Sequence, residues 1–81
     1  MNATDDKLKQ VMSAILRVPA DLIDDGTSPD TIDAWSSLAH LDLILAIEEE
    51  FGVTIPDEEV GDLTSYRLLR LTLEEQGAAA A

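Results

Sequence analysis

One uninterrupted stretch, residues 36–51, constrains the fold more than any other part of the chain. It contains neither Pro nor Gly, and Gly52 follows it. Ser36 suits the N-cap of a helix, because a serine side-chain oxygen accepts a hydrogen bond from a free backbone N–H of the first turn. Gly52 suits the helix end, because glycine adopts a positive φ at little cost. The stretch therefore predicts a central helix that presents Ser37 in its first turn.

This predicted helix has two different faces. At about 100° per residue, the side that we expect to be buried carries Leu43, Ile44, Ile47 and Phe51. The opposite side alternates apolar and acidic residues, namely Leu38, Asp42, Leu45 and Glu49. A merely solvated face has no need of two leucines, which indicates a docking surface for a partner. The alternative is an ordinary surface, since single exposed leucines are common.

Ser37 begins the predicted helix beside this second face. A helix N-terminus has unpaired N–H groups and a partial positive charge, so it stabilises a phosphate bound nearby. The alternative is that Ser36 and Ser37 are two capping candidates and nothing more. The pattern alone favours this plainer interpretation.

Three further helices are predicted around the central one. The first runs from Asp5, after a loose end of residues 1–4, to a stop at Pro19. A short one covers residues 57–60 before Gly61. The last is capped by Thr64 or Ser65 and ended by Gly77. The connection of residues 18–36 is long and needs apolar anchors, for which Leu22, Ile23, Ile32 and Trp35 are the candidates.

The 81 residues suffice for one small domain. Its core is expected to consist of Leu8, Val11, Met12, Ile15, Leu43, Ile44, Ile47, Phe51, Ile55, Val60, Leu63, Tyr66, Leu69 and Leu73. The sequence thus predicts an all-α fold with three main helices, one short helix and a long first loop. We assign residues 1–77 to this domain and expect residues 78–81 to be a disordered tail or a cloning scar.

Charge is distributed unevenly along the chain. The net charge is −12, and residues 18–66 contain most of the 17 acidic residues but no Lys or Arg. This balance excludes nucleic-acid binding and favours partners with basic patches, although plain solubility would also explain it. No apolar run approaches the roughly 20 residues that span a bilayer, and the first residues lack the features of a signal peptide. A cytoplasmic protein without membrane insertion is expected.

Catalysis by the chain's own side chains is not predicted. His40 is the only histidine, and it leans toward the buried face, which favours a structural role. The absence of cysteine excludes disulfides and thiolate chemistry. A single histidine without any cysteine also gives no basis for a metal site. A calcium loop that starts at Asp21 would place Ile23 and Ile32 where oxygen ligands are required, and one that starts at Asp24 fails as well.

The chain resembles the acyl carrier protein family most clearly in three segments, residues 35–43, 46–51 and 55–59. The similarity covers roughly residues 5–75. The family's signature is Asp-Ser-Leu at the start of its second helix, followed by an acidic amphipathic helix. Ser37 and Leu38 match the Ser-Leu part, whereas Ser36 stands in place of the aspartate. Residues 35–40 resemble stand-alone carriers of specialised acyl metabolism more than the housekeeping fatty-acid carrier.

The resemblance implies an antiparallel four-helix bundle whose Ser37 carries 4′-phosphopantetheine, transferred from coenzyme A. The thiol of that arm, not a side chain, would hold the acyl group as a thioester, so that the chain is a carrier and not an enzyme. One hypothesis is that the acyl chain enters the bundle core. The implied partners are a phosphopantetheinyl transferase, an acyl-loading ligase or acyltransferase, and downstream synthases of fatty-acid, polyketide or other specialised acyl metabolism. The implied partner-binding residues on this monomer are Ser36, Leu38, Asp42, Leu45, Glu48 and Glu49.

The serine at position 36 removes a carboxylate that could contact a basic transferase. A charge-assisted contact of this kind is worth roughly 1.5–3 kcal/mol. Its loss implies slower modification, a dedicated transferase or a specialised pathway. The alternative function is an unmodified, small acidic helical adaptor that binds basic partner proteins.

Overall fold

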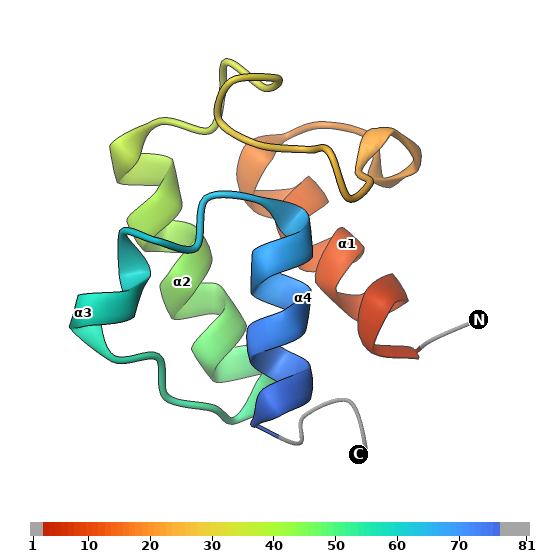
Figure 1. Cartoon of the computed structure of the whole chain (residues 1–81). Helices are drawn as coiled ribbons and strands as arrows, with labels where there is room; N and C mark the ends of the chain where they lie inside the picture. The colour runs from red at the N-terminus through yellow and green to blue at the C-terminus, as the bar shows by residue number, and fades with distance from the viewer. Residues whose placement is uncertain (1–2, 77–81) are drawn as a thin grey trace.

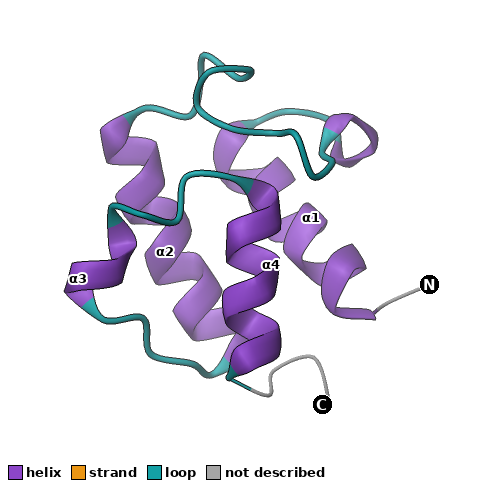
Figure 2. Ribbon diagram, in the orientation of Figure 1, coloured by secondary structure: helices purple, strands orange, loops and turns teal. Residues whose placement is uncertain are grey.

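The computed structural model describes residues 3–76, which form helices joined by loops (Figure 2). The elements are α1 (Ala3–Leu16), a 3₁₀ turn η1 (Ala20–Leu22), α2 (Ser37–Phe51), α3 (Asp57–Val60) and α4 (Tyr66–Glu75). No strand occurs among these residues. The predicted all-α class with three main helices, one short helix and a long first loop is therefore confirmed.

The three long helices lie side by side (Figure 1). Helix α1 runs opposite to α2 and α4, which point in the same direction. The long loop between α1 and α2 crosses the end of the bundle at which α2 and α4 begin, and α3 lies beside α2 on the edge of the molecule. This arrangement brings the loop to the first turn of α2, where Ser37 lies.

Apolar side chains from all three long helices meet in one core. The buried residues are Leu8, Met12, Leu16, Ile23, Trp35, Leu43, Ile44, Ile47, Ile55, Leu63, Tyr66, Leu69 and Leu73. Val11, Ile15, Phe51 and Val60, which were expected inside, are only partly buried and pack against the margin of this cluster. Leu16 was not predicted, although it continues the spacing of four residues from Leu8 and Met12 that one helix face requires.

The start and end of α1 differ from the prediction. The helix begins at Ala3, so residues 3 and 4 are not part of a loose end. It ends at Leu16, and Arg17 adopts a left-handed conformation with φ 58°. The Arg17 N–H still donates to the Ser13 carbonyl at 2.8 Å, as in a helix, but its left-handed backbone ends α1 before the predicted stop at Pro19. The predicted end at Gly77 and the tail of residues 78–81 lie outside the described residues.

The long loop is held by three of its four predicted anchors. Ile23 and Trp35 are buried and Ile32 is partly buried, but Leu22 is 66 % exposed. Leu22 is the last residue of η1, and neighbouring residues point in different directions, so the inward position goes to Ile23. A further, polar anchor is Thr27, which is buried and whose carbonyl accepts the Tyr66 N–H at 3.0 Å.

Polar bonds join the helices to one another and to the long loop. The Tyr66 hydroxyl donates to Asp5 Oδ1 at 2.7 Å, and Lys7 Nζ donates to the Glu50 carbonyl at 2.8 Å. Arg70 donates to Asp25 Oδ1 at 2.7 Å and so ties the long loop to α4. All five basic residues of the chain lie on α1, directly after it or on α4. Helices α2 and α3 and the loops before and after them therefore contribute no Lys or Arg of their own.

Candidate functional site

The first turn of α2 is fixed by its N-cap. Ser36 has an extended backbone, with φ −81° and ψ 175°, and its Oγ accepts the Ala39 N–H at 3.2 Å. Its carbonyl accepts the His40 N–H at 2.8 Å. At the other end Gly52 has φ 64°, in the left-handed region that glycine favours. Both predicted ends of the central helix are confirmed.

Ser37 is the first residue of α2 and its side chain is exposed. No hydrogen bond joins its Oγ to any other group within residues 3–76, whereas the Ser36 Oγ is occupied by the cap. The backbone N–H groups of Ser37 and Leu38 are likewise without an acceptor in this part of the chain. Both serines are exposed, but within residues 3–76 only the hydroxyl of Ser37 is free of hydrogen bonds. It lies at the positive end of a helix of 15 residues.

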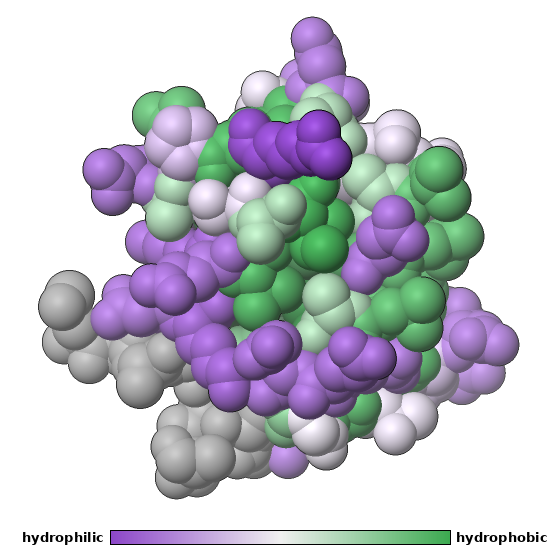
Figure 3. Space-filling model, turned by 180° about the vertical axis from the view of Figure 1, so that it is seen from behind, coloured by the Kyte–Doolittle hydropathy of each residue, from purple (hydrophilic) through white to green (hydrophobic). Residues whose placement is uncertain are grey.

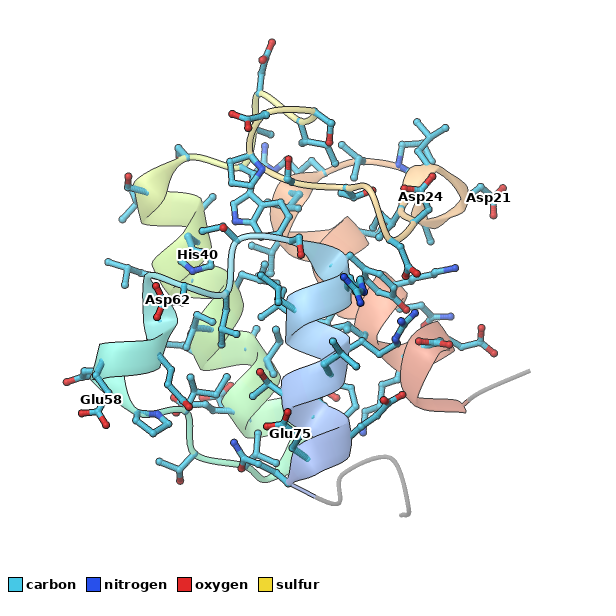
Figure 4. The ribbon with its side chains drawn as sticks, in the orientation of Figure 1. Asp21, Asp24, His40, Glu58, Asp62 and Glu75 are labelled. Atoms are coloured by element: carbon cyan, nitrogen blue, oxygen red, sulfur yellow. The ribbon has the colours of Figure 1, made fainter. Side chains whose placement is uncertain are left out.

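His40 connects this turn to the rest of the fold. The buried Trp35 donates through Nε1 to His40 Nδ1 at 2.9 Å, and the two rings stack with centroids 5.9 Å apart. His40 Nε2 lies 2.7 Å from the Val60 carbonyl at the end of α3. Figure 4 shows His40 projecting from α2 toward the segment that follows α3. The predicted structural role of His40 is therefore borne out by both ring nitrogens.

A hollow of about 380 Å³ opens beside Ser37. It is lined by Pro29, Trp35, Ser36, Ser37, His40, Leu41, Val60, Gly61 and Thr64. A larger hollow of about 860 Å³ lies between the end of α1 and the long loop, but neither serine lines it. Because a group attached to Ser37 would lie against the smaller hollow, we assign the candidate site to that one.

The predicted docking face of α2 is open to solvent. Leu38 is 71 % and Leu45 60 % exposed, and Asp42 and Glu49 are exposed between and beyond them. In the view from behind, hydrophobic side chains gather on the side of the molecule where α2 lies, with hydrophilic residues around them (Figure 3). Leu41, which is 54 % exposed, belongs to the same surface and was not predicted. Its position three residues after Leu38 and four before Leu45 was the signal for it.

Glu48, the remaining predicted partner-binding residue, is placed differently. It is partly buried, and its Oε2 accepts the Ile55 N–H at 2.8 Å. This carboxylate therefore holds the loop between α2 and α3, and its contact with partners stays a prediction. Within the part of the chain that the structure describes, no three His, Cys, Asp or Glu side chains form a group that could hold a metal ion. No helix of that part is long and apolar enough to cross a membrane.

Similarity to known proteins decides the family. No family model matches the chain. The chain is 35 % identical over 68 residues to the acyl carrier protein of Buchnera aphidicola subsp. Schizaphis graminum (strain Sg), and the alignment covers 83 % of this chain and 85 % of that protein. The chain belongs to the acyl carrier protein family. Acyl carrier proteins are non-catalytic carriers, so the function is to carry acyl groups for partner enzymes of acyl metabolism, not to catalyse a reaction.

Family membership bears on what the first turn of α2 could hold. Acyl carrier proteins generally bear a 4′-phosphopantetheine arm. Ser37, which is exposed in the first turn of α2, stays the predicted attachment residue. Such an arm supplies the thiol that a chain without cysteine lacks. The chain itself contributes a free hydroxyl, a helix N-terminus and an apolar hollow next to them, which would position such an arm.

Proposed function

We propose that this acyl carrier protein holds acyl intermediates as thioesters on a 4′-phosphopantetheine arm attached to Ser37 Oγ. The observation that carries the proposal is the exposed Ser37 hydroxyl, free of hydrogen bonds to residues 3–76, beside a serine that is occupied as the cap. In the attachment step Ser37 Oγ would attack the β-phosphorus of coenzyme A. The new P–O bond replaces the bond to the leaving 3′,5′-adenosine diphosphate, and the hydroxyl proton passes to a base of the transferase.

The electrostatics of the turn support a phosphodiester at this position. The N-terminus of α2 has partial positive charge and unpaired N–H groups, both of which favour an anion. The first turn of α2 contains no acidic residue, so the bound phosphate would meet no like charge within that turn. Acidic residues follow only from Asp42 onward.

The exposed side of α2 supports docking to partner enzymes. Leu38, Leu41 and Leu45 offer apolar contacts, and Asp42 and Glu49 offer charges for a basic rim. The proposed partners are a phosphopantetheinyl transferase, an acyl-loading ligase or acyltransferase, and downstream synthases of fatty-acid, polyketide or other specialised acyl metabolism. Ser36 retains the cap but offers no carboxylate to the transferase.

The test is the intact mass of the protein after incubation with coenzyme A and a broad-specificity phosphopantetheinyl transferase. Ser37→Ala is compared with Ser36→Ala, which loses the cap at a cost of about 1 kcal/mol but keeps the attachment hydroxyl. We expect the mass of one phosphopantetheine to be added to the wild type and to Ser36→Ala, and to be absent from Ser37→Ala. Modification of Ser37→Ala would disprove the assigned site.

The alternative function predicted from the sequence, an unmodified adaptor for basic proteins, would use the same exposed leucines and acids. The two functions differ in whether mass is added. If a panel of transferases leaves the wild type unmodified while a basic partner still binds the α2 face, the adaptor function replaces the carrier proposal. Loss of binding in Leu45→Ala would identify the face in either case.

A further inference from the structure

Helix α3 is held weakly by the rest of the fold. It contains four residues and none of them is fully buried. Within residues 3–76, a single side chain from another element hydrogen-bonds α3, namely His40, whose Nε2 lies 2.7 Å from the Val60 carbonyl. The Leu63 N–H reaches the same carbonyl at the longer distance of 3.3 Å. The imidazole therefore supplies the short polar tie between α2 and α3.

The hydrogen bond at the other ring nitrogen, Nδ1, determines the tautomer of His40. Trp35 Nε1 can only donate, so His40 Nδ1 must accept, at 2.9 Å. A neutral imidazole has one accepting and one donating nitrogen, so the proton is on Nε2 and is donated to the Val60 carbonyl. Both hydrogen-bonding positions of the ring are used, in one tautomer.

These two bonds join three segments at one edge of the candidate site. Trp35 belongs to the loop that leads into Ser36 and Ser37, His40 belongs to α2, and Val60 ends α3. Trp35, His40 and Val60 all line the hollow of about 380 Å³ next to Ser37. The bond from His40 to Val60 therefore joins α2 to the end of α3 at this hollow.

We propose that His40 is a positioning residue that clasps α3 to the first turns of α2 and so limits how far the hollow opens to an apolar chain held at Ser37. This inference rests on the proposed function for the identity of that chain. The bond to Val60 limits the opening, whereas the bond from Trp35 orients the loop before Ser37. Loss of one bond has a different effect from loss of the other, which general destabilisation would not produce.

Two amide substitutions separate the bonds. In His40→Gln the side-chain amide nitrogen can take the place of Nε2 and donate to the Val60 carbonyl, while the acceptor for Trp35 is lost. In His40→Asn the shorter side chain can accept from Trp35 at the place of Nδ1 but does not reach Val60. Trp35→Phe is the matched control for His40→Gln, because it removes the indole N–H and leaves the bond to Val60.

The first measurement is amide hydrogen exchange of the unmodified variants. The Asp62 N–H, which donates to the Glu59 carbonyl at 3.0 Å within the turn that ends α3, reports on whether this turn stays folded. Loss of the bond from His40 to the Val60 carbonyl should let the turn open more often. We expect about tenfold faster exchange of this amide in His40→Asn, as loss of one hydrogen bond implies, and little change in His40→Gln or Trp35→Phe. Equal acceleration in His40→Asn and His40→Gln, or none in either, would overturn the proposal that the bond from His40 to Val60 holds α3.

The second measurement uses protein whose Ser37 carries octanoyl-phosphopantetheine. A wider hollow should draw the octanoyl chain in more deeply, so hydroxylamine should cleave the thioester severalfold more slowly in His40→Asn than in His40→Gln. Equal or faster cleavage in His40→Asn would refute the control of the hollow. If Ser37 cannot be modified at all, the proposed function fails, and hydrogen exchange still decides on its own whether His40 holds α3.

Discussion

Ser36 combines a structural role with a missing charge. Its hydroxyl caps α2 through the Ala39 N–H, and asparagine and aspartate would cap about as well. Ser36→Asp would add a carboxylate next to the proposed attachment site without loss of the cap. If the transferase reads a negative charge at this position, Ser36→Asp should be modified roughly tenfold or more faster, as a charge-assisted contact implies.

The measurement is the initial rate of phosphopantetheine addition, followed by intact mass at limiting transferase. Ser36→Asn is the control, because it caps the helix without adding charge. Equal rates for the two variants would show that the transferase does not read this charge. The wild-type serine would then be neutral for modification.

Tyr66 links stability to alkaline pH. Burial, followed by the hydrogen bond to Asp5 and its negative charge, raises the pKa of the Tyr66 phenol above its ordinary value of 10.0, although Arg70 opposes the shift. A phenol whose pKa is raised on folding stabilises the fold below its unfolded-state pKa, and this contribution is lost as pH rises above it. We therefore expect the free energy of unfolding in urea to fall above about pH 10.

Tyr66→Phe tests this assignment. The variant should be less stable than the wild type by about 1 kcal/mol at pH 8, because Asp5 loses its donor. Above pH 10 the two proteins should converge, since phenylalanine has no proton to lose. An equally steep alkaline loss in the variant would mean that other groups, such as Lys7 and Lys9, are responsible.

At the scale of the elements, local signals predicted the ends of helices where a cap or a breaker was present. Ser36 and Gly52 bound α2, and Gly61 follows α3, as expected from the residue types. The prediction missed the start of α1 at Ala3, although the sequence places Asn2, a residue type that suits an N-cap, directly before it. Leu22 could not be assigned from the sequence, because the turn of η1 decides which of two neighbouring apolar residues points inward.

Arg17 offers a stabilising substitution at the end of α1. A non-glycine residue with φ 58° is strained by about 1 kcal/mol or more, a cost that glycine avoids. Arg17→Gly should raise the melting temperature by a few degrees, after allowance for the greater freedom of the unfolded glycine chain. Arg17→Ala keeps the strained conformation while losing the same charge. Thermal unfolding of both variants separates strain from charge, and equal melting temperatures would contradict the argument.

For the candidate site, periodicity predicted the exposed face of α2, whereas contacts between elements could not be predicted. Leu38 and Leu45 are exposed, as the helical periodicity predicted. The bonds of His40 to Trp35 and Val60, and of Glu48 to the Ile55 N–H, depend on how loops fold back on α2. A helix pattern shows only the direction in which a side chain leaves its helix, and not what it meets there.

At the scale of the whole molecule, the net charge of −12 sets the response to salt. Repulsion among the acids around α2 and α3 opposes folding, and added ions screen it. The ion pairs Lys7–Glu50 and Arg70–Asp25 would weaken in salt, but exposed pairs contribute only about 0–1 kcal/mol each. Sodium chloride at about 0.5 M should therefore raise the melting temperature by roughly 4–8 °C, which corresponds to about 1 kcal/mol. An unchanged or lower melting temperature would show that repulsion does not limit stability.

The placement of every basic residue on α1, just after it or on α4 has a practical consequence for peptide mapping. Trypsin cleaves after Lys and Arg, so a complete digest releases residues 18–67 as one long acidic peptide that contains both serines of the site. Such a fragment ionises poorly in positive mode and cannot by itself distinguish Ser36 from Ser37. A protease that cleaves at Asp would cut at Asp33 and Asp42 and deliver the two hydroxyls in a short peptide, in which fragmentation between them assigns the arm to one serine.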